Sequence, residues 1–362
     1  MSRDWTLPNR SLPDPMAPGR IEFLCALSLG HQRRTPSRQG SSIHRTHPAP
    51  GRSRLTQPGI PNHLVLSTSC YGSRLKTIED QAFAAVAMGF RRLELGLSEV
   101  PVPLNGWEDS RRETGICVDS VVVGSLNPRM QNMSGSRLGA MDAEERERAL
   151  NSSRRHIRLA QRLQAPIVVV RGCEVEDSRL ATEGDQLAEE MELATVDTHE
   201  QIAEKVCDYV HRVQKKGQRQ LEHFCRSLHT LHSEFPDTRI AIEPGLQFND
   251  LLNFEAMEWT LEDLSKFGLG YWHDTGRIQL RERAGLPGQG QWLDSFSSRM
   301  LGVHLQDAAD SQDELPPGQG EVDFRLVSEY IPADAVRVVE MNERHGRAAI
   351  LASVHFLMEQ GF

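Results

Sequence analysis

The sequence predicts an α/β protein built as a (β/α)₈ TIM barrel, and two observations support this fold class. Short apolar runs, typical of buried parallel strands, alternate with helical patterns along residues 61–362. Eight such runs are present, and eight strand–helix units close a parallel sheet into a barrel. An open, doubly wound sheet is the structural alternative, but no G-x-G-x-x-G segment follows any of the runs.

The expected strands and helices follow one another in a regular order. Thr77 is predicted to cap a helix that closes at Gly89, and Asp142 to cap a long helix. Two helical patterns occupy residues 199–234, and a last apolar helix runs over 347–358. The strands are expected at residues 64–67, 92–95, 116–123, 167–170, 239–243, 269–273, 301–305 and 336–340.

Residues 1–60 differ in composition from the rest of the chain. They contain nine Arg, eight Pro, no Lys and only three acidic residues. Such a segment cannot bury enough apolar surface to offset the entropy of ordering it, so we expect it to be disordered. A transit peptide and a start codon placed too far upstream are the alternatives. The predicted organisation is therefore an N-terminal extension, residues 1–60, followed by a barrel, residues 61–362.

Composition excludes several classes of partner. No apolar run approaches the roughly 18 residues of a membrane span. The formal net charge is -9 although the first 60 residues are basic, so the barrel is acidic and is not expected to bind nucleic acid. The cysteines are scattered and never form C-x-x-C, which favours reduced thiols in a cytoplasmic enzyme.

Four of the later strands end in side chains that bind metals. Glu243, Asp274, His304 and Glu340 are separated by 31, 30 and 36 residues, each about one strand–helix unit. Consecutive strands of a barrel are neighbours, so this spacing predicts four ligands at the C-terminal rim, where barrel enzymes place their active sites. Two glutamates, an aspartate and a histidine are mostly hard ligands. They favour Mn²⁺, Mg²⁺ or Co²⁺ with open coordination positions over a closed zinc site.

Three segments carry a resemblance to a known family. They read G-Y-W-H-D-T-G at 270–276, G-V-H-L-Q-D at 302–307 and L-P-P-G-Q-G-E-V-D-F at 315–324. Together they resemble the xylose isomerase-like TIM barrels over about residues 62–360. That superfamily includes sugar phosphate isomerases and epimerases, ketose 3-epimerases, inosose dehydratases and endonuclease IV.

The resemblance implies a function for the four ligands. In the ketose epimerases a Glu, an Asp, a His and a Glu from strands five to eight hold the metal, and these match Glu243, Asp274, His304 and Glu340. It also implies that Glu243 and Glu340 act as an acid–base pair next to a substrate carbonyl. We therefore expect a divalent-metal-dependent isomerase or epimerase of a small sugar, polyol or hydroxy-keto acid. Mn²⁺ is the favoured cofactor, with Mg²⁺, Co²⁺ and Zn²⁺ as alternatives.

One position departs from the family pattern. The family commonly places a substrate-binding His three residues after the aspartate of strand six, whereas this chain has Arg277. This Arg either grips a carboxylate or phosphate of the substrate or pairs with a nearby acid such as Asp307. Arg171 and Asp307 are further candidates for substrate binding, and Glu94 is expected to face the barrel interior. His273, by strand alternation, should point toward the helices.

Other functions remain open at this level. A cyclitol dehydratase of the inosose type begins with the same proton abstraction. An endonuclease-IV-like DNA repair nuclease is disfavoured, because no His lies between residues 63 and 156 and the barrel is acidic. Arg277 is the one argument for a degenerate barrel that binds a metabolite without catalysis. The expected partner is a sugar-like small molecule, and similar proteins commonly form homodimers or homotetramers.

Overall fold

The computed structural model describes residues 59–98, 101–127 and 137–362, which form a closed barrel of eight parallel strands. β1 pairs with β10 in parallel, which closes the sheet and excludes the open alternative. The predicted extension, residues 1–60, lies almost entirely outside the described residues. Around the barrel the strand order is β1-β10-β7-β6-β5-β4-β3-β2. The barrel strands are β1 (Leu64–Ser67), β2 (Arg92–Leu95), β3 (Cys117–Val122), β4 (Ile167–Arg171), β5 (Arg239–Glu243), β6 (Gly270–Asp274), β7 (Met300–Leu305) and β10 (Val336–Val339).

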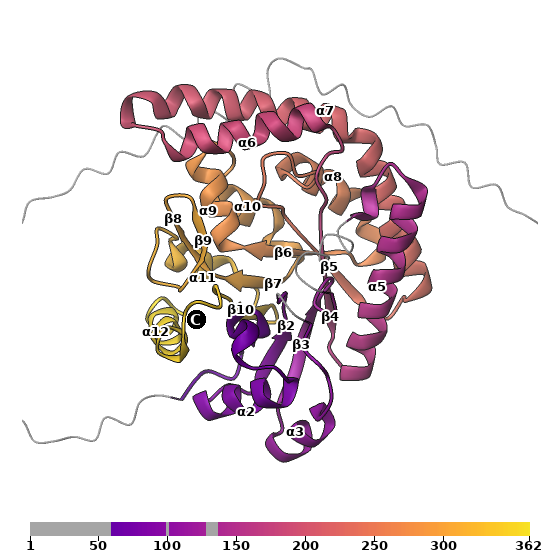
Figure 1. The fold of residues 1–362 in the computed structure, drawn as a ribbon, viewed down its shortest axis with the longest axis vertical. Coiled ribbons are helices and arrows are strands. Elements are labelled where there is room, and N and C mark those ends of the chain that lie inside the picture. Colours follow the sequence, from indigo (N-terminus) through magenta and orange to yellow (C-terminus); the bar gives the residue numbers. More distant parts are fainter. Residues whose placement is uncertain (1–58, 99–100, 128–136) are drawn as a thin grey trace, which may run out of the picture. The chain divides into compact units, whose positions relative to one another are not determined.

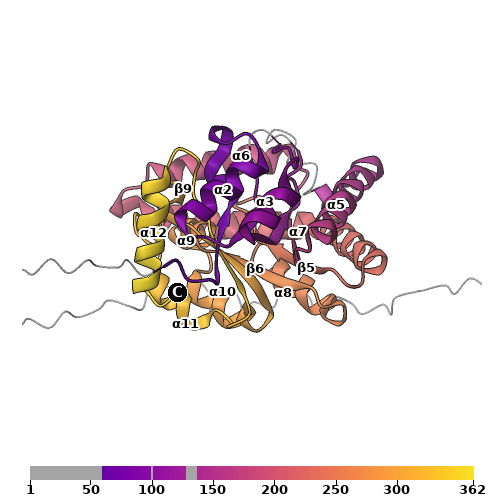
Figure 2. The same ribbon diagram turned by 90° about the horizontal axis from the view of Figure 1, so that it is seen from below.

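Helices surround the strands (Figure 1), and α2 packs beside α3 in the view of Figure 2. None of the helices in the described ranges is both long and apolar enough to cross a membrane. The α-helices are α2 (Ile78–Met88), α3 (Trp107–Thr114), α5 (Ala143–Leu163), α6 (Ser178–Glu192), α7 (Val196–Glu234), α8 (Phe254–Asp263), α9 (Thr275–Arg283), α10 (Gln289–Phe296), α11 (Phe324–Tyr330) and α12 (Arg347–Glu359). Short 3₁₀ turns are η1 (Thr68–Arg74), η3 (Arg137–Gly139), η4 (Ser265–Phe267) and η5 (Ser297–Arg299).

The predicted helix ends are confirmed by their caps. The Thr77 side chain accepts a hydrogen bond from the Asp80 amide at the start of α2, and Gly89 ends that helix with φ of 114°. A left-handed φ of this kind favours glycine, because a side chain there would be strained. Asp142 caps α5 by accepting from the Glu145 amide.

One helix prediction was wrong. The two helical patterns expected over residues 199–234 form a single helix, α7, of 39 residues. Gly217 lies inside it, and a Cβ there would come within 2.8 Å of Val175 and Leu251. The glycine therefore permits close packing rather than marking a break. α6, which was not predicted, runs beside α7, and Tyr209 of α7 donates to the Leu180 carbonyl of α6 at 2.6 Å (Figure 1).

The barrel interior is filled by apolar side chains below a polar layer. The indole of Trp272 is its largest member and is fully buried, and a Cβ at Gly302 would meet this ring at 2.3 Å. Strand alternation directs Tyr271 and His273 of the same strand the other way, as predicted. His273 there contacts the Tyr271 hydroxyl and Gln289 of α10, each at 2.8 Å. The apolar interior comprises Val65, Val122, Ile167, Val169, Ala241, Trp272 and Val338.

A small hairpin extends the C-terminal end of the barrel after β7. It consists of β8 (Asp307–Ala309) and β9 (Gln312–Leu315), which pair antiparallel. The Asn342 amide donates to the Glu314 carbonyl at 2.7 Å, which ties the hairpin to the segment that follows β10. The hairpin therefore stands over the rim at which the predicted ligands end.

Candidate metal centre

The four predicted ligands meet at one rim of the barrel. Glu243, Asp274 and His304 end or nearly end the neighbouring strands β5, β6 and β7, and Glu340 directly follows β10. All four are buried, with exposed fractions between 0 and 9%. The Nδ1 atom of His304 lies 2.6 Å from a Glu243 oxygen, 3.5 Å from a Glu340 oxygen and 4.0 Å from an Asp274 oxygen. The spacing in the sequence thus brings these side chains together as expected.

The other nitrogen of His304 faces Glu94 of β2. Nε2 lies 3.0 Å from one oxygen of this fully buried carboxylate. Ser67 and Ser120 donate to the two Glu94 oxygens at 3.0 and 2.8 Å, so the carboxylate is fixed from both neighbouring strands. The ring of Trp272 packs edge-on against the imidazole at 5.2 Å between centroids. His304 is therefore oriented with Nδ1 toward the ligand cluster and Nε2 toward Glu94.

This geometry fits a divalent ion. Ligand atoms held about 2.1 Å from one ion lie no more than about 4.2 Å from one another. The distances from His304 Nδ1 stay within that limit. The ligand atoms of Glu243, Asp274 and His304 lie within 4.8 Å of one another, so this group would have to contract slightly around an ion, and Glu340 does not belong to it. Glu94, His304 and Glu340 form a second group that meets the same criterion. An orienting carboxylate on the far nitrogen of a ligand histidine is a usual feature of metal sites.

Arg277 lies inside the cluster and does not pair with Asp307. Its Nη1 donates to Glu243 at 2.7 Å, and its Nε lies 3.2 Å from an Asp274 oxygen. The Asp274 carboxylate also caps α9 by accepting from the Arg277 amide at 2.9 Å. Arg277 thus pairs with two of the predicted metal ligands, Glu243 and Asp274, and not with Asp307, the nearby acid expected from the sequence. The guanidinium therefore bridges Glu243 and Asp274, while the second Glu243 oxygen faces His304, so an ion bound by these residues would share both carboxylates with Arg277.

The charges of the cluster shift the pKa values of its members in opposite directions. Burial opposes ionisation of Glu243, but the charges of Arg277 and His304 outweigh it and hold its pKa well below the usual range. Burial raises the pKa of Asp274 to about 6 and that of Glu340 to about 7, and Glu94 and Glu314 reinforce the shift of Glu340. Burial lowers the pKa of His304, but the three surrounding glutamates outweigh it and raise the pKa well above normal. Asp274, His304 and Glu340 thus hold protons more tightly than usual, because several carboxylates lie close together in a buried place, whereas Glu243 does not.

A cavity of about 490 Å³ opens above the cluster. Arg171, Arg277 and Glu340 form part of its wall, together with the hairpin residues 311–314 and the segment 341–344. Arg171 ends β4, and its Nε lies 3.4 Å from a Glu243 oxygen. A volume of this size accommodates a sugar-sized molecule.

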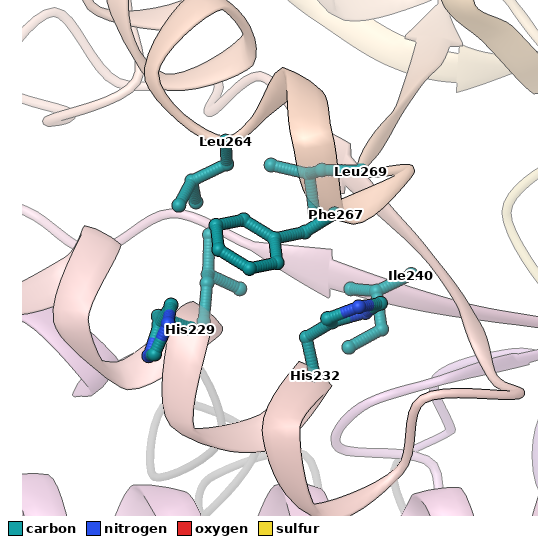
Figure 3. A pocket seen from close by; sticks show the side chains of 7 residues that line it. His229, His232, Ile240, Leu264, Phe267 and Leu269 are labelled. Atoms are coloured by element: carbon teal, nitrogen blue, oxygen red, sulfur yellow. The ribbon is translucent and has the colours of Figure 1, made fainter.

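A second pocket lies near the opposite end of the barrel, beside the amino ends of β5 and β6 (Figure 3). His229 and His232 of α7 flank the ring of Phe267 there. Its volume of about 10 Å³ is close to the space of a single water molecule, which excludes it as a substrate site.

Asp307 organises the loop that follows the hairpin. Its carboxylate accepts hydrogen bonds from the amides of Gly318, Gly320 and Val322 at 2.8–3.0 Å. Gly318 adopts φ of 93°, and a Cβ at Gly320 would meet the Ala308 carbonyl oxygen at 2.4 Å, so these glycines shape the loop. Substrate binding by Asp307 stays a prediction, since the contacts present are those of a structural residue.

Two polar residues of the site were missed. Gln306 donates from Nε2 to both oxygens of Asp274 at 2.8 Å. It lies two residues after His304, and the alternation of a strand would have placed it on the same face. Ser69 donates to Glu340 at 3.2 Å from the 3₁₀ turn after β1. Nothing in the sequence around Ser69 signals this contact.

Comparisons with known proteins agree with this geometry at the level of the fold. No protein-family model matches the sequence, and no curated protein is similar enough to match it. Among solved structures, a 3-keto-D-glucoside 4-epimerase, YcjR, from E. coli superposes with a TM-score of 0.57 at 16% identity, over 83% of this chain and 100% of that one.

Two further structures show the same likeness. A xylose isomerase domain-containing protein from Salmonella typhimurium gives a TM-score of 0.52 at 14% identity, over 82% of this chain and 96% of its own. The IolI protein, whose structure contains a bound zinc atom, gives a TM-score of 0.51 at 10% identity, over 82% of this chain and 95% of its own. The chain has the fold of the xylose isomerase-like TIM barrels, as the resemblance of its motifs implied.

Proposed function

We propose that the protein is a divalent-metal-dependent isomerase or epimerase of a small sugar, polyol or hydroxy-keto acid. The observation that carries this proposal is the gathering of Glu243, Asp274 and Glu340 around His304, next to a cavity of about 490 Å³ that Glu340 lines. The similar solved structures include sugar epimerases, which supports the same class. Mn²⁺ is the ion we favour, and we expect a cytoplasmic enzyme because the cysteines are scattered along the sequence and never form C-x-x-C.

We assign the proton transfers to Glu243 and Glu340. Glu243 on β5 and Glu340 after β10 approach His304 from strands separated by β6 and β7. In the proposed reaction one carboxylate removes the proton from the carbon next to the substrate carbonyl, and the other returns a proton to the opposite face. A bound divalent ion supplies Lewis acidity for the carbonyl oxygen. One Glu243 oxygen accepts a hydrogen bond from Arg277, and this contact fixes the orientation of the other carboxylate oxygen.

Solvent-deuterium incorporation tests this proposal. A panel of ketoses, cyclitols and keto acids is incubated with the protein and Mn²⁺ in D₂O and followed by NMR. We expect exchange at one carbon of one substrate family. Glu243→Gln and Glu340→Gln should each slow it by about 10²–10⁴-fold, the usual contribution of a general acid or base. Asp119→Asn, the same change at a carboxylate paired with Arg92 instead of the cluster, is the matched control.

Metal analysis of the purified variants completes the test. A stoichiometric divalent ion should be present in the wild type and lost in Glu243→Ala and Glu340→Ala. Retention of the ion in both variants would show that the ligands are misassigned. Loss of water from a cyclitol, with no epimer or isomer formed, would instead establish the dehydratase.

A further inference from the structure

Two arginines project into the cavity beside the same metal ligand. Arg277 donates to Glu243 at 2.7 Å from α9, and Arg171 approaches the same oxygen at 3.4 Å from the end of β4. Both line the cavity. We propose that the substrate carries an anionic oxygen group, a carboxylate or a phosphate, which Arg171 and Arg277 bind together. This inference rests on the proposed function and narrows its substrate class to acids or phosphorylated sugars.

The hydrogen-bonding state of the two guanidinium groups supports this assignment. Arg277 is 6% exposed, and its buried Nε has no hydrogen-bond acceptor although Asp274 lies near it. Within residues 59–98, 101–127 and 137–362, no nitrogen of the Arg171 side chain forms a hydrogen bond, and Glu243 is its one ion-pair partner. A buried guanidinium such as that of Arg277 is unfavourable unless its donors are satisfied, whereas the side chain of Arg171 is 29% exposed and can present its donors to a ligand in the cavity. A planar oxyanion satisfies several such donors at once, whereas a neutral hydroxyl satisfies one.

The charge balance of the site leads to the same class of ligand. Four buried carboxylates surround His304, those of Glu94, Glu243, Asp274 and Glu340. A divalent ion and the two arginines compensate them, so the metal-loaded floor of the cavity is close to neutral and accepts an anion without strong repulsion. With a neutral residue at position 277, the same floor would keep a net negative charge and would repel one.

The acids of the hairpin also face these arginines. Asp313 lines the cavity, and its charge acts on both Arg171 and Arg277. Burial raises the pKa of Asp313, and the neighbouring Glu314 raises it further. Asp313 thus shares the cavity wall with the two arginines, and we expect a bound oxyanion to compete with it for their charge.

Calorimetric binding of three matched probes tests the inference. D-glucitol, D-gluconate and D-glucitol 6-phosphate share a hydroxylated six-carbon chain and differ in bearing no charge, a carboxylate or a phosphate. Each is titrated into the full chain with and without Mn²⁺. We expect one of the two anions to bind at least about tenfold more tightly than D-glucitol, as a charge-assisted, bidentate contact provides. The better of the two anions identifies the group as carboxylate or phosphate.

Variants separate the arginines from the metal. Two variants should each reduce the preference for the anion to about threefold or less. Arg171→Gln removes a charge at a side chain that is 29% exposed, and Arg277→Lys keeps the charge but loses the bidentate geometry of the guanidinium. Arg239→Gln, at the exposed opposite end of the strand that carries Glu243, should leave it unchanged.

Two results of the titrations with Mn²⁺ would overturn the inference. One is equal binding of all three probes by the wild type, and the other is an anion preference that survives in Arg171→Gln and Arg277→Lys, because the group would then bind the ion alone. Tight Mn²⁺ binding without any anion preference defeats the inference but leaves the proposed function intact. Failure of the wild type to bind Mn²⁺ defeats the proposed function and overturns the inference as well, because the charge balance that admits an anion requires the ion.

Discussion

The two ring nitrogens of His304 face different partners. Nδ1 faces Glu243 and Glu340 at 2.6 and 3.5 Å, and Nε2 faces Glu94 at 3.0 Å. An imidazole between carboxylates carries two protons when no ion is present, which agrees with its raised pKa. A divalent ion held by Nδ1 would replace the proton there, and the proton on Nε2 would stay on the hydrogen bond to Glu94. We therefore expect Glu94 to be a positioning residue for the predicted metal ligand.

Replacing Glu94 should weaken metal binding without removing a predicted ligand. We expect Glu94→Gln to raise the dissociation constant for Mn²⁺ by about 10–100-fold, the usual effect of losing an orienting partner. Glu94→Asp keeps the charge but withdraws the carboxylate from Nε2, so it should also weaken binding. Asp119→Asn on the neighbouring strand is the control. Calorimetry with Mn²⁺ measures the constants, and unchanged affinity in both Glu94 variants would exclude the positioning role.

The residues of the site differ in how far the sequence could predict them. Glu243, Asp274, His304 and Glu340 were predictable, because each stands where a strand ends and parallel strands end at one rim. The partners of Arg277 were not, since they depend on which side chains the closed barrel directs inward. A lone arginine in the sequence does not distinguish a substrate contact from an ion pair.

At the scale of elements, a buried histidine joins α5 to the turn after β3. His156 of α5 donates from Nδ1 to the Ser152 carbonyl at 2.7 Å. Its Nε2 accepts from the amides of Gly124 and Leu126 at 3.0 and 3.2 Å. The ring must therefore be neutral, because a proton on Nε2 would face two N–H donors. Burial lowers the pKa of His156 to about 4.

This histidine makes the stability of the fold depend on pH. The pKa of His156 is lower in the folded chain than the value of 6.5 for the unfolded one, so the unfolded state binds more protons between these values. Its contribution is complete above pH 6.5 and is lost as the pH falls toward 4. Between pH 7 and pH 5 the loss from this residue should be about 2 kcal/mol of unfolding free energy.

Urea denaturation at the two pH values measures the loss. In His156→Gln, which cannot titrate, the decrease in stability from pH 7 to pH 5 should be smaller than in the wild type by that amount. The exposed His355, paired with Glu359 along α12, provides the control variant His355→Gln, which should behave like the wild type. An equal pH dependence in all three proteins would show that His156 titrates normally in the fold.

The elements themselves were predictable to different degrees for a physical reason. All eight barrel strands lie within one or two residues of their predicted positions, because strands buried on both faces require uninterrupted apolar runs. The hairpin strand Gln312–Leu315 was missed, since it is polar and held by contacts to distant segments such as the pair of Asn342 and Glu314. The apolar pattern of a sequence indicates which segments are buried, so it does not reveal a hairpin that lies outside the hydrophobic core.

At the scale of the whole molecule, the barrel concentrates buried charge at one end. Apolar side chains such as Trp272 and Val338 fill the interior, and the carboxylates of Glu94, Asp274 and their neighbours lie at the rim above them. Like charges held this close destabilise the fold unless cations or protons compensate them. We therefore expect the stability of the barrel to depend on whether a cation occupies this site.

Metal loading should accordingly raise the thermal stability of the whole chain. An ion that binds only the folded state adds about 2.7 kcal/mol when present at 100 times its dissociation constant, which corresponds to a rise of roughly 5 °C in Tm. Calorimetry with Mn²⁺ and again after EDTA measures the shift. His304→Ala, which removes the residue at the centre of the cluster, should lose the shift, and Arg239→Gln at the other end of β5 should keep it. The same rise in both variants would mean that the ion binds elsewhere on this acidic barrel.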